Sequence, residues 1–265
     1  MTTSTVFLTG QGFLECPRWH GGRFWFADWT RGEILAVDEN GALGAHASVP
    51  APPLSFDFSR DGRMLIVQSR AGQLLRREVD GRLAVFAELG EGVWNEIVVD
   101  GRDNTYVNGP QLLLITPEGK VSSEATDLAF PNGMAVTADN QTLILAESHG
   151  RRLTAFDIGF DGHLSNRRVW AQLEGPPDGI CIDQAGAVWY ADVPNRYCRR
   201  VQEGGTVLDE VNLDRGAFAC MLGGTDRQTL LITAAKWFGM EGMAEMAGTG
   251  QLVTVPVSVP GTGWP

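Results

Sequence analysis

A short pattern of residues recurs along the chain at intervals close to forty residues. The residue that begins each copy is followed, four positions later, by an apolar residue of strand type, and then by a turn of the Asp-x-x-Gly kind. Copies begin at Glu15, Leu54, Asn95, Asn132 and Asp178, and a sixth, less sharply placed copy begins near Ala219. The resulting intervals of 37 to 46 residues are typical of four-stranded β-propeller blades. The sequence therefore predicts an all-β, six-bladed propeller formed as a single domain by residues 1–265.

The local sequence between these positions supports the same interpretation. Each copy contains short runs of Val, Ile, Leu and aromatic residues, separated by turns such as residues 38–41 (DENG) and 161–162 (DG). Helical periodicity is essentially absent, and the 33 glycines fit a chain with many turns. Residues 4–9 form one strand-like run with no partner nearby in the sequence. We expect this N-terminal strand to join the last blade and close the ring.

The composition excludes several classes of partner. The chain has 21 basic and 32 acidic residues, a net charge of −11 and no basic stripe, so nucleic acid is not an expected partner. No apolar run reaches the length of a membrane span, and the N-terminus lacks the features of a secretory signal. The four cysteines are widely spaced and are expected to be reduced. These features predict a cytoplasmic protein that acts on a small molecule, and none of them indicates an oligomeric state.

The first residue of each copy carries the functional prediction. Equivalent positions of the blades lie at the same depth around one axis, so Glu15, Asn95, Asn132 and Asp178 should converge there. Two carboxylates and two amides that face each other favour a cation between them. An all-oxygen set suits calcium best, with magnesium, manganese, zinc and ferrous iron as alternatives. We expect one divalent ion, although these residues would also serve to cap strands and bind water in the channel.

The loops after the second strand of each blade should surround the same end of the channel. They and the axial asparagine supply the expected substrate contacts, which are Trp29, Arg70, His149, Trp237, Phe238 and Asn95. Such a mixed mouth suits a small organic ligand with one polarised group. The segment 236–250, rich in Met and aromatic residues, is expected either to pack over the channel or to form a lid.

A cation with open positions toward this mouth would polarise a carbonyl or phosphoryl oxygen. Asp178 at the rim of the ion would accept a proton from attacking water, a combination that favours hydrolysis of an activated ester. No Gly-x-Ser-x-Gly elbow, His-x-x-x-His spacing or Gly-x-Gly-x-x-Gly loop after a strand offers a competing catalytic set. Phosphotriester hydrolysis, a lyase or isomerase reaction on the same ion, and metal-stabilised binding without turnover are the alternatives.

Three segments of the chain resemble those of a known family. Residues 14–19 (LECPRW), 130–134 (FPNGM) and 177–183 (PDGICID) are similar to the signature segments of the gluconolactonase, regucalcin (senescence marker protein) and luciferin-regenerating enzyme family. The resemblance, which covers nearly the whole chain, implies a six-bladed propeller with one divalent ion held by Glu15, Asn132 and Asp178. It also implies that Asp178 is the general base. Asn95 matches an asparagine that contacts substrate or ion in this family and in the related diisopropyl-fluorophosphatase-like propellers.

One position departs from the family pattern. Sugar-lactone members often carry an arginine two residues before the matching asparagine, where it reaches sugar hydroxyls, and here that position is Val93. With aromatic residues expected around the mouth, this departure favours a lactone or ester less polar than a sugar lactone. The alternative is that Arg70 or Lys236 takes the arginine's place. The sequence as a whole predicts a metal-dependent hydrolase of the lactonase type.

Overall fold

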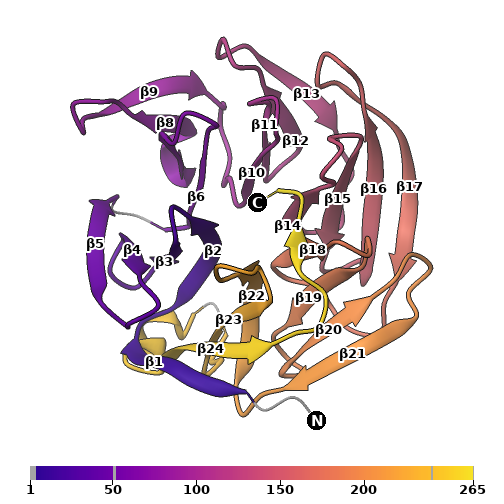
Figure 1. The fold of residues 1–265 in the computed structure, drawn as a ribbon. Helices are drawn as coiled ribbons and strands as arrows, with labels where there is room; N and C mark the ends of the chain where they lie inside the picture. Colours follow the sequence, from indigo (N-terminus) through magenta and orange to yellow (C-terminus); the bar gives the residue numbers. More distant parts are fainter. Residues whose placement is uncertain (1–3, 50–51, 240, 265) are drawn as a thin grey trace.

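Six antiparallel sheets stand around a central axis, as the repeat predicted (Figure 1). The computed structural model describes residues 4–49, 52–239 and 241–264. Within each sheet, consecutive strands of the chain are neighbours, and among the described strands only β1 and β25 are paired out of chain order. The innermost strand of each blade faces the axis and the last strand lies at the rim. The fold is therefore a six-bladed β-propeller.

The strands of the first three blades have the following bounds. Blade 1 contains β2 (Leu14–His20), β3 (Arg23–Asp28), β4 (Glu33–Val37) and β5 (Leu43–Ser48). Blade 2 contains β6 (Leu54–Phe58), β7 (Met64–Gln68), the 3-10 helix η1 (Ser69–Ala71), β8 (Gln73–Arg77) and β9 (Leu83–Glu88). Blade 3 contains β10 (Ile97–Val99), β11 (Thr105–Asn108), β12 (Leu112–Ile115) and β13 (Val121–Ala125).

The other three blades repeat this arrangement. Blade 4 contains β14 (Pro131–Val136), β15 (Thr142–Glu147), β16 (Arg152–Ile158) and β17 (Leu164–Gln172). Blade 5 contains β18 (Ile180–Asp183), β19 (Val188–Asp192), β20 (Tyr197–Val201) and β21 (Val207–Asn212). Blade 6 contains β22 (Gly216–Gly223), β23 (Thr229–Ala235), β24 (Gly250–Pro256) and, as its outer strand, β1 (Thr5–Gln11).

The N-terminal strand joins the two ends of the chain. β1 pairs antiparallel with β24, from Thr5 opposite Thr254 to Gln11 opposite Gly250. The outer strand of blade 6 thus comes from the opposite end of the sequence to its three neighbours. This pairing ties blade 6 to the segment that leads into blade 1 and closes the ring.

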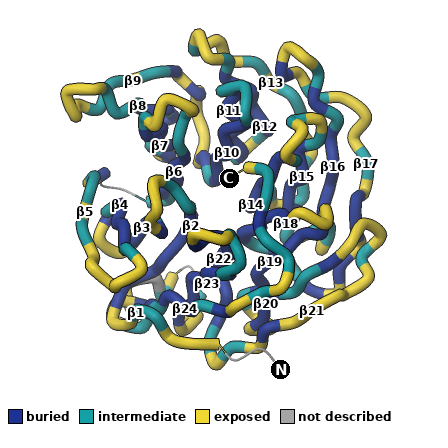
Figure 2. Tube along the Cα trace, viewed as in Figure 1, coloured by how far each residue is buried: buried dark blue, intermediate teal, exposed yellow. Residues whose placement is uncertain are grey.

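The buried side chains form six layers, each between two adjacent blades. The layer between blades 2 and 3, for example, combines Leu65 and Val67 with Ile97 and Val107. Equivalent clusters lie between every other pair of neighbouring blades. Because each blade is covered on both faces, its inner strands are buried throughout, whereas exposed residues gather at the turns and rim (Figure 2).

The C-terminal segment forms an element that the sequence did not indicate. β25 (Gly261–Thr262) adds to the innermost strand of blade 5, with Thr262 opposite Ile182, and Trp264 forms a β-bridge with Val136 of blade 4. Both partners lie at the ends of their strands, opposite the end where the predicted site residues lie. The segment therefore crosses that far end of the channel, where Figure 1 shows the C-terminus near the axis.

The segment 236–250 packs against the core through its short 3-10 helix, η2 (Met243–Met246). Met246 is fully buried in the cluster between blades 1 and 2, beside Phe13 and Trp29. This buried contact fits the expectation that the segment packs against the propeller, which was one of the two roles considered for it. All four cysteines are buried and free, as expected. No helix in the described ranges is long and apolar enough to cross a membrane.

Candidate metal centre

The structure places the four predicted oxygen-bearing residues at the starts of innermost strands. Glu15 lies in β2 and Asn132 in β14, while Asn95 and Asp178 each come two residues before their strands, β10 and β18. Adjacent blades are joined here by backbone hydrogen bonds, such as that from Gly133 N to Asp178 O at 3.2 Å. The four residues therefore share one end of the channel.

The two asparagines are in direct contact. Asn95 Nδ2 donates to Asn132 Oδ1 and to the carbonyl oxygen of Pro131, both at 3.3 Å. Asn132 Nδ2 in turn points to Ser148 Oγ at 3.4 Å. Side-chain oxygens of blades 3 and 4 are thus held a few ångströms apart at the channel wall.

The two carboxylates are close enough to perturb each other. Burial raises the pKa of Glu15 well above its usual range, and the negative charges of Asp178 and Glu96 raise it further. Burial, followed by the charges of Glu96 and Asp192, likewise raises the pKa of Asp178. Such shifts mean that the ionised forms lack sufficient positive partners nearby.

Local backbone geometry aims Glu15 at the channel. The pairing of β2 with β3 shifts register between Glu15 and Arg18, and Cys16 within this bulge has a φ of 53°. A positive φ is uncommon for a residue with a side chain, and bulges redirect neighbouring side chains. In the described part of the chain the Glu15 carboxylate accepts one hydrogen bond, from Cys16 N at 3.3 Å. Most of its capacity to accept is therefore left for another partner.

These observations fit a hard cation. Two carboxylates with raised pKa values, one buried and one half-buried, and two amide oxygens are the ligand types that calcium prefers. Within the described ranges, no three His, Cys, Asp or Glu side chains form a metal-binding group. The predicted set has only two such side chains, since its other members are amides. The donor chemistry, rather than a cluster of charged ligands, is what points to a cation here.

The sixth copy of the repeat is centred on Phe218 and not on Ala219. Gly179 N donates to Phe218 O at 2.9 Å, as Gly133 N does to Asp178 O one blade earlier. A register shift in β22 between Ala217 and Ala219 places Phe218 in this position. The blade therefore contributes a buried phenyl ring where blade 5 contributes a carboxylate.

The end of the channel consequently has two different sides. Blades 3, 4 and 5 provide what we call the polar half, Asn95, Asn132 and Asp178. Blades 6 and 1 provide the aromatic half, Phe13, Trp29, Phe218 and Trp237. Its rings pack edge to face, with centroids 4.6 Å apart for Phe13 and Phe218, 5.0 Å for Phe13 and Trp29, and 5.6 Å for Phe218 and Trp237.

The residues expected to contact substrate lie around this mouth and differ in exposure and in hydrogen bonding. Trp29 is buried and donates from Nε1 to Leu54 O at 2.6 Å, so it forms a wall. Trp237 and Phe238 are 40% and 48% exposed. Arg70 is exposed and donates from Nε to Pro52 O at 3.1 Å, and the exposed His149 ring stacks on Phe130.

Three further residues belong to the polar half. Asn108 Nδ2 donates to Asn132 O at 2.6 Å, and Ser148 Oγ donates to Pro177 O at 2.6 Å, so both brace the segments that carry Asn132 and Asp178. Glu96 lies directly after Asn95 and is 8% exposed. Asn108 and Ser148 lie in loops expected at the mouth, but nothing in their sequence distinguishes them from ordinary loop residues.

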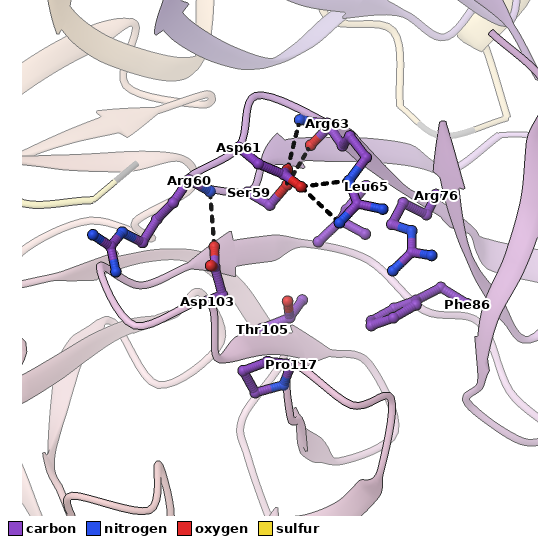
Figure 3. Close-up of a pocket in the computed structure, with 10 residues that line it drawn as sticks. All are labelled: Ser59, Arg60, Asp61, Arg63, Leu65, Arg76, Phe86, Asp103, Thr105 and Pro117. Atoms are coloured by element: carbon purple, nitrogen blue, oxygen red, sulfur yellow. Dashed lines mark hydrogen bonds and ion pairs between the residues drawn. The ribbon is translucent and has the colours of Figure 1, made fainter. Parts of the chain in front are cut away.

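A cleft on the surface lies away from this centre. It has a volume of about 420 Å³, lies between blades 2 and 3, and is lined by residues that include Arg63, Arg76 and Phe86 (Figure 3). Arg63 pairs with Asp61 at 2.6 Å, and Arg76 pairs with Glu78 at 2.9 Å while its guanidinium lies over Phe86. None of the residues predicted for the site lines this cleft, and Arg63 and Arg76 are already paired.

Comparison with known proteins identifies the family of this chain. Residues 13–236 match the model of a family described as the SMP-30/Gluconolactonase/LRE-like region. The 6-deoxy-6-sulfogluconolactonase of Pseudomonas putida is 26% identical over 273 residues, covering 95% of this chain and 93% of that protein. Pentonolactonase XacC of Haloferax volcanii is 26% identical over 258 residues, covering 89% and 86%.

A solved structure shares the fold over its full length. A calcium-binding protein, regucalcin, from Agrobacterium tumefaciens superposes with a TM-score of 0.83 at 19% identity, over 100% of this chain and 97% of that chain. The matched family region begins just before β2 and ends just after β23, so it spans most of the propeller. The chain therefore belongs to the SMP-30/gluconolactonase/LRE-like family.

Proposed function

We propose that the protein is a metal-dependent hydrolase that opens a lactone or a related small ester. The observation that carries the proposal is the pair of carboxylates with raised pKa values, buried Glu15 and half-buried Asp178, beside the amides of Asn95 and Asn132 at one end of the channel. Two relatives that match most of the chain are named as lactonases, which supports the same reaction class.

The ion would be held by Glu15, Asn132 and Asp178, with Asn95 beside them. Calcium is the preferred candidate because all of these donors are oxygen atoms and because a structural neighbour is described as calcium-binding. When bound, such an ion supplies a Lewis acid that polarises a carbonyl oxygen. The side chains themselves hold the ion, orient the substrate and move the proton.

Asp178 is the proposed general base. Its backbone is held on both sides, because its N donates to Ala191 O at 2.8 Å and its O accepts from Gly133 N at 3.2 Å. A carboxylate at this position is a suitable acceptor for a proton from water. A base so positioned would take the proton of a water that attacks the lactone carbonyl. Asn95, with its Oδ1 not used in the contact to Asn132, would orient the substrate.

The substrate is proposed to carry an apolar portion. Trp237 and Phe238 are exposed at the mouth, and Val93, where sugar-lactone members often have an arginine, is 52% exposed. An aromatic wall next to a polar, charged site suits a molecule with one polarised ester and an apolar body. Arg70 of blade 2 and His149 of blade 4 are the proposed polar contacts.

A hydrolysis screen tests the proposal. Protein stripped of metal is assayed with a pH indicator against sugar lactones, aliphatic and aromatic lactones and a phosphotriester, with and without calcium, manganese, zinc or ferrous iron. We expect metal-restored turnover of at least one lactone, with apolar lactones preferred. Turnover of the phosphotriester alone, or no turnover alongside clear metal-dependent thermal stabilisation, would contradict a lactonase.

A further inference from the structure

A buried polar network lies directly beneath Glu15 and joins blades 1, 2 and 3. We call it the Arg18 network; it consists of Cys16, Arg18, Asp57 and Glu96, all at most 8% exposed. Arg18 donates to Ile97 O at 2.6 Å and to Glu96 Oε1 at 3.3 Å, and its Nε lies 3.4 Å from Asp57 Oδ1. Asp57 Oδ2 accepts a hydrogen bond from Val99 N at 2.8 Å.

The network is connected to Glu15 through Cys16. The Cys16 thiol lies 3.4 Å from Glu96 Oε1 and 3.1 Å from Phe56 O, while Cys16 N donates to the Glu15 carboxylate at 3.3 Å. Movement of Glu96 would therefore be transmitted to the bulge that aims Glu15 at the channel. The contact runs across three blades, since these residues come from β2, β6 and the start of β10.

Glu96 uses only one of its two oxygens within this network. Oε1 accepts from Arg18, from Cys16 and from Ile97 N at 3.0 Å. Oε2 accepts no hydrogen bond from any residue in the described ranges. Oε2 is also not among the fully buried side-chain atoms that lack a partner in the described ranges, so it is not enclosed by the network and is left free to act on a charge outside it.

The charges of the region do not balance. Arg18 supplies one positive charge, whereas Asp57, Glu96, Glu15 and Asp178 supply four negative charges when ionised. The ionised region therefore carries an excess of three negative charges, and all of its members except half-buried Asp178 are buried. Such an excess is stable at neutral pH only if protons or a cation compensate it.

We propose that Glu96 is a positioning residue that supplies the third carboxylate charge of the metal centre. Arg18 holds it through Oε1, so that its charge faces Glu15 and the channel and strengthens the binding of a cation by the other residues. The inference rests on the proposed metal site. Glu96 lies outside the three signature segments, residues 14–19, 130–134 and 177–183.

Cation affinity of the intact protein tests this role without reference to turnover. Calcium binding is measured by titration calorimetry, and terbium binding by sensitised luminescence, on the wild type and on Glu96→Gln. Removing the charge should weaken calcium binding by about 10–100-fold, the range typical of residues that support metal ligands. Because a Coulomb energy scales with the charge of the ion, the loss for trivalent terbium should be about 1.5 times larger on a logarithmic scale.

Two further comparisons separate charge from structure. Glu96→Asp and Glu96→Asn form a second pair, in which both side chains are one methylene shorter than Glu and only the first is charged. If Glu96→Gln does not fold, this pair still tests the charge, and Glu96→Asp should bind calcium more tightly than Glu96→Asn. Asp183→Asn is the matched control, because Asp183 is also buried and paired with an arginine, Arg200, but lies at the far end of β18. It should lower stability and leave the Kd for calcium unchanged.

The outcomes distinguish this inference from the proposed function. No cation binding by the wild type would remove the metal centre and the inference together. Tight binding by the wild type with an equal Kd in Glu96→Gln, or in both members of the Asp/Asn pair, would overturn the role of Glu96 and leave the metal centre in place. An equal logarithmic loss for calcium and terbium would show that Glu96 acts through structure and not through its charge.

Discussion

The polar and aromatic halves of the mouth are built on the same backbone frame. Asp178 and Phe218 occupy equivalent positions of adjacent blades, because each accepts a backbone hydrogen bond from the residue after the preceding blade's frame residue. One position carries a carboxylate with a raised pKa and the other a buried ring packed on Phe13. The comparison teaches that the repeat fixes the position of a side chain at the channel, whereas the type of residue at that position differs from blade to blade.

The two halves also differ in how firmly they are held. The aromatic half is packed edge to face, and Trp29 adds a hydrogen bond to Leu54 O. The polar half is braced mainly by hydrogen bonds from Asn108 and Ser148, and the pKa of its carboxylate, Asp178, is raised by burial and by the charges of Glu96 and Asp192. We therefore expect changes in the polar half to affect chemistry and cation binding, and changes in the aromatic half to affect substrate preference.

The largest effect is expected for Asp178→Asn. The substitution keeps the size of the side chain and removes the proposed base, so kcat at saturating metal should fall by about 10²–10⁴-fold. The measurement is lactone hydrolysis at several metal concentrations, with bound metal determined in parallel. A variant that retains both the ion and full activity would show that Asp178 is not the base.

Glu15→Gln should act on the ion first. Loss of a charged ligand should weaken calcium binding by more than the 10–100-fold typical of supporting residues, and kcat should recover in part at high calcium. Calorimetric titration and activity as a function of calcium measure the two quantities. An unchanged Kd for calcium in Glu15→Gln would show that Glu15 of blade 1 does not hold the cation.

The pH dependence of stability offers a test without substrate. Because the pKa values of Glu15 and Asp178 are raised in the folded protein, the folded state holds more protons than the unfolded chain above about pH 4. The free energy of unfolding contributed by these groups therefore falls as pH rises through the raised values. As the pH rises above about 4, the Tm of metal-free wild-type protein should therefore change in the destabilising direction relative to the Tm of the Glu15→Gln/Asp178→Asn double variant.

Saturating calcium should remove most of this difference, because a bound cation stabilises the ionised carboxylates. Thermal unfolding of both proteins, each with calcium and with chelator, completes the comparison. Parallel curves for the wild type and the double variant would mean that these carboxylates keep ordinary pKa values.

The smallest effect is expected in the aromatic half. Trp237→Ala removes an exposed ring at the mouth and should raise KM for an aromatic lactone by about 10-fold, with little change in kcat or in KM for a sugar lactone. Phe160→Ala is the matched control, because this ring is 94% exposed and lies in the hairpin of blade 4 near Arg102, far from the mouth. Equal changes for both lactones would deny the aromatic half a role in substrate preference.

Much of this architecture was predictable from local sequence. Strand runs, tight turns and a period near forty residues indicate blades, because each blade must bury both of its faces against its neighbours. The same frame selected Glu15, Asn95, Asn132 and Asp178, which the structure places at one end of the channel. Glu96 could not be selected in this way, because its role depends on Arg18 of another blade, 78 residues away in sequence.

Chain order and residue pattern thus determined the class of fold, the number of blades and the four oxygen-bearing residues, since these follow from a repeated local unit. Tertiary structure alone decided that a register shift centres the sixth copy on Phe218, that the C-terminal segment pairs with β18, and that Glu96 lies against Arg18 and Cys16. These features depend on contacts between distant segments and on one-residue shifts of register. Such contacts and register shifts do not recur from blade to blade, so they produce no repeated pattern in the sequence. They are set by the packing of neighbouring blades.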